Sequence, residues 1–90
     1  MKVLKFGAVW CSGCLVMKPR WQQIEKEHPW LVTEYIEFDE ENDQIKHFSI
    51  DRERLPVFVF QDKTGNEIER VSGGIDKKIL VDKINQYKNK

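Results

Sequence analysis

The sequence predicts an α/β domain in which a four-stranded mixed sheet is flanked by helices on both faces. Three features point to this class: an apolar run near the N-terminus, a long helical pattern directly after it, and two strand-like runs before a final helical pattern. A strand, a helix and a second parallel strand form a βαβ unit, which is normally right-handed. With 90 residues the chain has room for one such domain, assigned to residues 1–90.

The first half of the chain is predicted to fold as strand, helix and strand. Residues 3–9 have the length and the β-branched and aromatic content of a buried strand. A helix is expected to begin near Ser12 and to end at about Glu27, with Pro19 kinking its axis because proline removes an amide donor. Its buried side is expected to consist of Leu15, Val16, Trp21 and Ile24. Apolar residues then recur at spacings of two and four through residues 31–38, as a strand requires.

The second half is predicted to add a short helix, a hairpin and a last helix. Asn42 or Asp43 is placed to cap the short helix. The apolar run 57–60 and the alternating run 67–71 are joined by a polar turn that contains a glycine, which is typical of a hairpin. Asp76 is placed to cap the last helix, whose regularly spaced residues are Ile79, Leu80, Lys83, Ile84 and Tyr87. The resulting order is βαβαββα.

Charge and composition argue against several classes of function. Fifteen basic residues balance fifteen acidic ones, whereas a nucleic-acid-binding domain usually has a basic excess. No stretch approaches the roughly 20 apolar residues that span a bilayer, and residues 1–10 lack the long apolar core of a secretory signal. We therefore expect a cytoplasmic protein that has neither nucleic acid nor a membrane as partner.

The only two cysteines, Cys11 and Cys14, lie two residues apart where the first strand leads into the first helix. Both would lie in the first turn of that helix, where unpaired amide groups and the positive end of the helix dipole stabilise a thiolate. In a reducing compartment a lone cysteine pair is rarely a structural disulfide. The pair is therefore interpreted as catalytic, redox-sensing or metal-binding.

Four features together resemble the thioredoxin family over nearly the whole chain. They are the run Trp10–Cys14, Pro19 five residues after the second cysteine, the pair Leu55-Pro56 before a buried strand, and the pair Gly73-Gly74 after the hairpin. A Cys-x-x-Cys motif alone is a weak signal, but its combination with the other three is specific. The resemblance implies a thioredoxin-like fold and an enzyme that reduces protein disulfides.

The resemblance also implies a role for each cysteine. Cys11, at the exposed start of the helix, is expected to attack a substrate disulfide, and the more buried Cys14 to resolve the mixed disulfide. Electrons would come from a flavin- and NADPH-dependent reductase. The chain itself is expected to bind no cofactor, since it has no glycine-rich phosphate loop, and to be a monomer.

A substrate-binding surface is expected around the motif. Trp10 would form one wall of it. Pro56 is expected to follow a cis peptide bond, which would present the backbone of Leu55 to an extended substrate. Gly73 would let the backbone approach the sulfurs without an intervening side chain.

The chain departs from the family pattern in its length and in its motif. Only a short apolar run precedes Trp10, where the family usually has an additional strand and helix. The linker Ser12-Gly13 stands where family reductases commonly have Gly-Pro, which relaxes the first helical turn and alters the thiolate pKa and the reduction potential. The segment between Phe48 and Pro56 is about two residues longer than usual, by the same comparison with the family.

A further departure concerns the proton acceptor. Lys5 occupies the position, six residues before the first cysteine, where the family keeps a buried acid that takes the proton of the second thiol. One hypothesis is that Lys5 pairs with Glu37 or Tyr35 and favours the thiolate, while Glu37 or water takes the proton. The alternative is that Lys5 only extends its ammonium group to solvent.

Two other classes of function compete with the oxidoreductase. Cys11, Cys14, His28 and His47 are four potential zinc ligands, but the histidines are separated far beyond zinc-finger spacing, so no metal site is predicted. The second alternative is a non-catalytic binding domain that holds a partner in the groove around Trp10, Leu55 and Gly73 and uses the cysteines as a redox switch.

Overall fold

The computed structural model describes residues 1–90 and has the predicted order of strands and helices, with one additional short 3₁₀ helix. In chain order the elements are β1 (Lys2–Gly7), α1 (Ser12–Glu27), β2 (Val32–Glu37), α2 (Asp43–His47), η1 (Arg52–Arg54), β3 (Val57–Gln61), β4 (Glu67–Ser72) and α3 (Lys77–Tyr87). None of the helices has the length and apolar character that crossing a bilayer requires.

The four strands form one mixed sheet in the order β2-β1-β3-β4. β1 pairs in parallel with β2 and antiparallel with β3, and β3 pairs antiparallel with β4. The central strands β1 and β3 are the most buried because both of their faces are covered, whereas nearly all residues of the edge strands β2 and β4 are half-buried or exposed. The parallel register places Lys5 opposite Tyr35 and Gly7 opposite Glu37. These four side-chain positions share one face of the sheet, since alternate residues of a strand point the same way.

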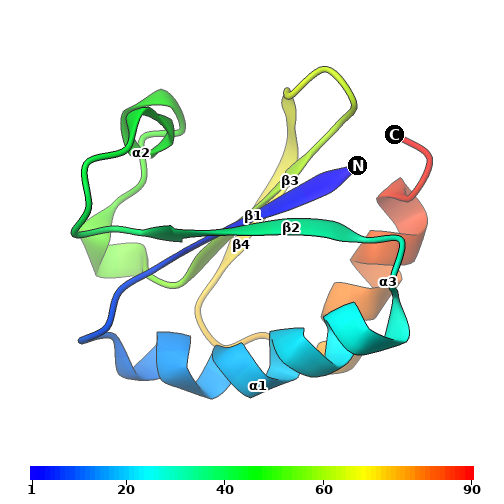
Figure 1. Cartoon of the computed structure of the whole chain (residues 1–90), viewed down its shortest axis with the longest axis horizontal. Coiled ribbons are helices and arrows are strands. Elements are labelled where there is room, and N and C mark those ends of the chain that lie inside the picture. The colour runs from blue at the N-terminus through cyan, green and yellow to red at the C-terminus, as the bar shows by residue number, and fades with distance from the viewer.

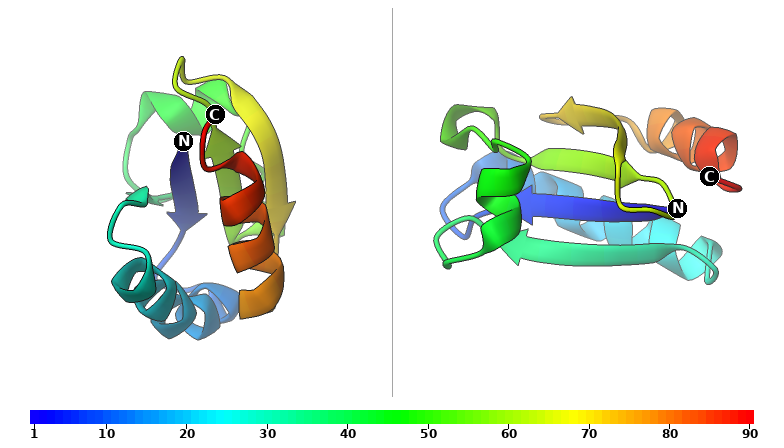
Figure 2. Two further views of the ribbon diagram at one scale, coloured as in Figure 1. Left: turned by 90° about the vertical axis from the view of Figure 1, so that its right-hand side faces the viewer. Right: turned by 90° about the horizontal axis from the view of Figure 1, so that it is seen from above.

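Helices cover both faces of the sheet, as predicted (Figures 1 and 2). α1 and α3 lie on one face, where the buried cluster consists of Val3, Met17, Trp21, Ile24, Phe58, Phe60, Leu80 and Ile84. The segment that contains α2 and η1 lies on the other face, where the buried cluster consists of Leu4, Phe6, Ile36, Phe48, Ile50, Val57 and Val59. The motif that joins β1 to α1 is therefore held between a central strand and the longest helix.

The buried side of α1 differs from the prediction at its start. Leu15 and Val16 are 60% and 57% exposed, and Met17 is buried instead. Met17 lies one and two turns before Trp21 and Ile24, so these three side chains form one stripe against the sheet. The first turn of α1 extends past the edge of the core, which leaves its apolar residues at the surface.

The structure tests the predicted helix caps and shows how Lys83 fits into the apolar stripe of α3. Asn42 caps α2, because its side-chain oxygen accepts the Gln44 amide at 2.8 Å. Asp76 occupies the cap position of α3, but its side chain makes no capping hydrogen bond, so this part of the prediction is wrong. Lys83, within the apolar stripe of α3, forms an ion pair of 2.6 Å with Glu69 on β4. The pair explains how a lysine fits there.

Candidate active site

Cys11 and Cys14 form a disulfide at the N-terminus of α1, with their Cα atoms 5.2 Å apart. Cys11 is the N-cap residue, with extended backbone angles, and its sulfur accepts the backbone amide of Cys14 at 3.2 Å. A helix begins here because the sulfur takes the place of the oxygen of a serine or aspartate cap. In the reduced protein the same amide and the helix dipole stabilise negative charge on the Cys11 sulfur.

The relative burial of the two cysteines is the reverse of the expectation. Cys11 is only 7% exposed, whereas Cys14 is half-buried. The backbone of Cys11 folds back on the end of β1, and its amide donates to the Ala8 carbonyl at 3.1 Å. Cys14, one turn later, borders an open cavity instead of the core.

Pro56 lies directly against the cysteine motif, and the Leu55-Pro56 peptide bond is cis, as the resemblance implied. A Cβ atom on Gly13 would lie 3.2 Å from the Pro56 ring, so the small residue in the linker allows the close approach. The carbonyl of Leu55 accepts no hydrogen bond within the chain, and its amide makes only a long contact of 3.5 Å with the Arg52 carbonyl. The neighbouring Ser12 is exposed to solvent.

Gly73 is tied to the same loop, because its amide donates to the Pro56 carbonyl at 2.9 Å. The reason expected for this glycine is not the one observed. A Cβ atom there would meet nothing within 4 Å, whereas its φ of 85° lies in the region that disfavours other residues. Glycine is therefore required by the backbone conformation and not by contact with the sulfurs in the isolated chain.

Trp10 is held from two sides although it is 46% exposed. Its indole nitrogen donates to Asp39 Oδ2 at 2.7 Å, and the guanidinium carbon of Arg52 lies 4.5 Å from the ring centroid. Arg52 belongs to the segment between Phe48 and Pro56 that the sequence marked as long. The loop after β2 and this segment therefore fix the orientation of the indole next to the disulfide.

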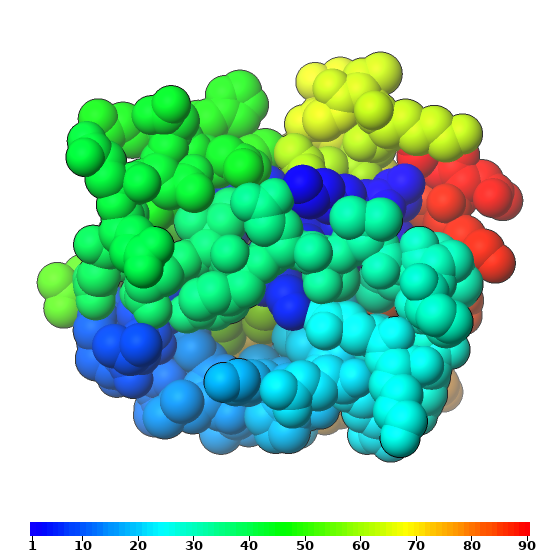
Figure 3. All heavy atoms as spheres, viewed as in Figure 1, coloured from blue at the N-terminus to red at the C-terminus, as the bar shows by residue number.

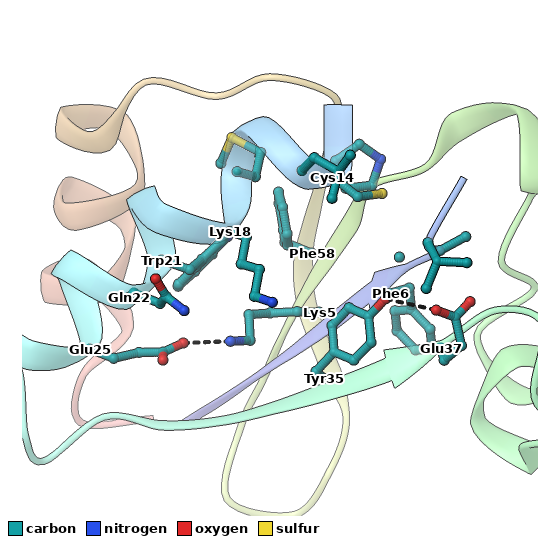
Figure 4. A pocket seen from close by; sticks show the side chains of 16 residues that line it. Lys5, Phe6, Cys14, Lys18, Trp21, Gln22, Glu25, Tyr35, Glu37 and Phe58 are labelled. Atoms are coloured by element: carbon teal, nitrogen blue, oxygen red, sulfur yellow. Dashed lines mark hydrogen bonds and ion pairs between the residues drawn. The ribbon is translucent and has the colours of Figure 1, made fainter. Parts of the chain in front are cut away.

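A cavity of about 360 Å³ opens beside Cys14, between α1 and the sheet (Figure 3). Its walls carry polar side chains from three elements, namely Lys5, Lys18, Glu25, Tyr35 and Glu37. In Figure 4 the amino groups of Lys5 and Lys18 and the hydroxyl of Tyr35 point into this space. Cys14 therefore shares this cavity with several groups that can bind or release a proton.

Lys5 pairs with neither Glu37 nor Tyr35, so this part of the hypothesis is wrong, whereas the role of Glu37 or water as proton acceptor stays a prediction. Its Nζ lies 2.5 Å from Glu25 Oε2 on α1, and Thr33 on β2 donates to the same oxygen at 3.0 Å. The Lys5 side chain is only 15% exposed, so the alternative in which it merely reaches solvent is wrong as well. Figure 4 shows this ion pair at the end of the cavity away from Cys14.

Tyr35 and Glu37 instead form a pair of their own, with the hydroxyl donating to Glu37 Oε1 at 3.1 Å. Tyr35 is 54% exposed, and partial burial raises its pKa to about 12, with further contributions from its hydrogen bond to Glu37 and from the charge of that carboxylate. The hydroxyl therefore stays protonated near neutral pH. The sequence predicts that Tyr35 and Glu37 lie near the site, but as alternative partners of Lys5 and not of each other.

The two histidines lie in unrelated surroundings. The His28 ring follows α1 and its Nδ1 lies 2.9 Å from the Ile24 carbonyl, while His47 is exposed on α2 with its ring against Phe48. No group of three or more His, Cys, Asp or Glu side chains is arranged to hold a metal ion.

Comparison with known proteins identifies one family. The sequence model described as Thioredoxin matches residues 1–86. Thioredoxin H7 of Arabidopsis thaliana is 36% identical over 86 residues, which are 96% of this chain and 64% of that protein. The TPR repeat-containing thioredoxin TDX of the same plant is 32% identical over 94% of this chain and 21% of its own. The chain thus spans less than two thirds of the length of these curated relatives.

Solved structures of similar proteins give the same result. The thioredoxin of Fasciola hepatica superposes with a TM-score of 0.82 and 28% identity, covering 94% of this chain and 78% of that one. A thioredoxin of Nicotiana alata also has a TM-score of 0.82, with 30% identity over 94% of this chain and 70% of its own.

Proposed function

Since the chain belongs to the thioredoxin family, whose chemistry is thiol-disulfide exchange, we propose that it reduces disulfides in protein substrates. The observation that carries the proposal is the Cys11–Cys14 pair at the N-terminus of α1, with the Cys14 amide directed at the Cys11 sulfur. A thiolate held in this way is more abundant at neutral pH than that of a free cysteine.

Cys11 is the proposed nucleophile. Its thiolate attacks one sulfur of the substrate disulfide, the substrate S–S bond breaks, and the other substrate sulfur leaves as a thiolate that takes a proton from solvent. The product is a mixed disulfide between Cys11 and the substrate. Because Cys11 is only 7% exposed, its attack favours an extended, accessible disulfide.

Cys14 is the proposed resolving residue. After losing its proton, its sulfur attacks Cys11, the Cys11–substrate bond breaks and the Cys11–Cys14 disulfide forms. The substrate leaves with both of its sulfurs reduced. The Cα atoms of the two cysteines are 5.2 Å apart, so the second step needs no movement of the backbone.

The proposed substrate surface consists of the exposed residues around the disulfide. Trp10, fixed by Asp39 and Arg52, offers an apolar face, and the free carbonyl of Leu55 offers a hydrogen-bond acceptor to an extended chain. Pro56 and Gly73 hold the backbone of this surface in place. The Ser12-Gly13 linker remains the proposed determinant of the reduction potential.

The proposal includes the source of electrons and the place of action. A flavin- and NADPH-dependent reductase would regenerate the dithiol, and the chain would act in the cytoplasm as a monomer without a bound cofactor. Membership of the thioredoxin family supports the reductase as electron source, and a lone cysteine pair is consistent with a reducing compartment.

The test is insulin reduction by the dithiol form, with dithiothreitol as the electron source. Cys11→Ser is expected to remove all activity. Cys14→Ser, reduced beforehand and mixed with insulin after dithiothreitol has been removed, is expected to stop after one attack and to accumulate a protein–insulin mixed disulfide that mass spectrometry detects. If the wild-type protein reduces insulin no faster than dithiothreitol alone, the catalytic proposal is wrong and the redox-switch alternative takes its place.

A further inference from the structure

The resolving thiol of this chain needs a proton acceptor, and the residue at the family's usual acidic position cannot be one. Lys5 stands there, and its ammonium group is bound to Glu25 at the far end of the cavity. Near Cys14 the same cavity instead presents Tyr35 and Glu37.

Gly7 leaves an opening between Cys14 and Tyr35. A Cβ atom at Gly7 would lie 3.2 Å from Cys14 Sγ and 3.2 Å from Tyr35 Oη. The sulfur and the hydroxyl are therefore no farther apart than twice that distance, which one bridging water can span. From the hydroxyl, Glu37 Oε1 is 3.1 Å away. One water between the sulfur and the hydroxyl would complete a path from the thiol to a carboxylate.

From this geometry we infer that Tyr35 and Glu37 form the proton relay of Cys14, a role that rests on the proposed function. The S–H bond of Cys14 breaks and its proton passes through one bridging water to Tyr35 Oη, while the Tyr35 proton moves to Glu37 Oε1. The electron pair left on the Cys14 sulfur then attacks Cys11, the substrate leaves as a thiolate, and Glu37 returns its proton to that thiolate or to solvent.

The surroundings of the relay hold its groups in position. Glu37 Oε2 accepts the backbone amide of Asp39 at 3.2 Å, which fixes the carboxylate with its other oxygen toward Tyr35. The raised pKa of Tyr35 keeps the hydroxyl neutral, so it gives up its own proton only as it receives the one from Cys14. The other charged groups that face this region are Asp39 and Glu40 after β2, Lys5 on β1, and Lys18 and Glu25 on α1. Among these, Lys5 and Glu25 neutralise each other.

The test follows the reaction of the reduced protein with dithiobis(nitrobenzoate), which releases two coloured aryl thiolates in sequence. The first release reports attack by Cys11 and the second reports attack by Cys14. Because the aryl thiolate leaves without needing a proton, the second phase isolates deprotonation of Cys14. Tyr35→Phe and Glu37→Gln are compared with the matched control Tyr87→Phe. Tyr87 lies on the remote helix α3, and its hydroxyl binds Glu69 on β4.

Tyr35→Phe and Glu37→Gln are expected to slow the second phase at least about tenfold at pH 7, since a positioned acid–base group contributes about 10²–10⁴ in rate. The first phase stays unchanged, and Tyr87→Phe changes neither phase. The difference between variants and wild type closes as the pH rises toward 10, because hydroxide then removes the proton. A purely structural role for Tyr35 would instead give a deficit independent of pH.

Gly7→Ala provides an independent variant, because its methyl group would enter the space between the sulfur and the hydroxyl. It is expected to slow the second phase selectively. Second phases within twofold of wild type in both Tyr35→Phe and Glu37→Gln between pH 6 and 8 overturn the relay while leaving the proposed function intact. A wild-type first phase no faster than that of free cysteine contradicts the proposed function, and the relay with it.

Discussion

Removal of the Lys5–Glu25 ion pair tests whether the role of Lys5 is structural or catalytic. The pair joins β1 to α1 with an N···O distance of 2.5 Å and side chains that are 15% and 31% exposed. A charge-assisted hydrogen bond contributes about 1.5–3 kcal/mol when buried, and an exposed ion pair about 0–1 kcal/mol. For this intermediate burial we expect Lys5→Met to lower the free energy of unfolding by about 1–2 kcal/mol.

Methionine is the chosen replacement because it keeps an unbranched apolar stem beside Trp21, whose ring centroid lies 5.8 Å from the Lys5 ammonium. Urea unfolding of Lys5→Met, Glu25→Gln and the double variant gives the coupling energy of the pair, expected at about 1–2 kcal/mol. Thr33 continues to donate to residue 25 in each case, so the cycle reports the ion pair and not the loss of all partners.

The functional half of this prediction concerns the reactivity of Cys14. In a Cys11→Ser background, the double variant is expected to alter the alkylation rate of Cys14 at pH 7 by less than about twofold, a difference of about 0.4 kcal/mol. The reason is that a neutral pair is removed at the far end of the cavity. A coupling energy below about 0.5 kcal/mol refutes the structural role, by comparison with exposed pairs. A rate change above tenfold shows that Lys5 acts on the thiol.

Three further predictions concern the scaffold. Leu80→Ala, at a fully buried position between α3 and the sheet, is expected to cost about 2–5 kcal/mol in urea unfolding, and a loss below 1 kcal/mol would contradict the packing described. Gly65→Ala, at a φ of 89° in the β3–β4 turn, is expected to cost about 1 kcal/mol although nothing lies within 4 Å of the added methyl. The pKa of Glu69 is lowered by its hydrogen bonds from Lys83 and Tyr87, so its stabilisation is present above the unfolded-state pKa of about 4.3 and is lost as the pH falls through the lower folded-state pKa. Glu69→Gln should therefore lose less stability than wild type on acidification below pH 5, and parallel losses would show that this carboxylate is not linked to folding.

The fold was predictable because its signals are local. The apolar run of β1 leads directly into the Cys-x-x-Cys motif, and the hairpin of β3 and β4 has a polar turn with a glycine. Neither signal depends on the tertiary contacts between the helices and the sheet. The failures occurred where a local pattern was compatible with two environments: Leu15 and Val16 are as apolar as Met17, but only the position of α1 on the sheet decides which of them is buried.

By itself, the order of residues determined which two cysteines pair and that they lie at the start of a helix, because both depend on residues within one turn of each other. Only the packed structure decided the partner of Lys5. Its stem starts beside Tyr35 in the sheet register, yet its charge lies 2.5 Å from Glu25, twenty residues away on the covering helix. A half-buried charge is bound by the nearest opposite charge in space, and that distance is set by how helix and sheet pack, which no spacing along the chain encodes.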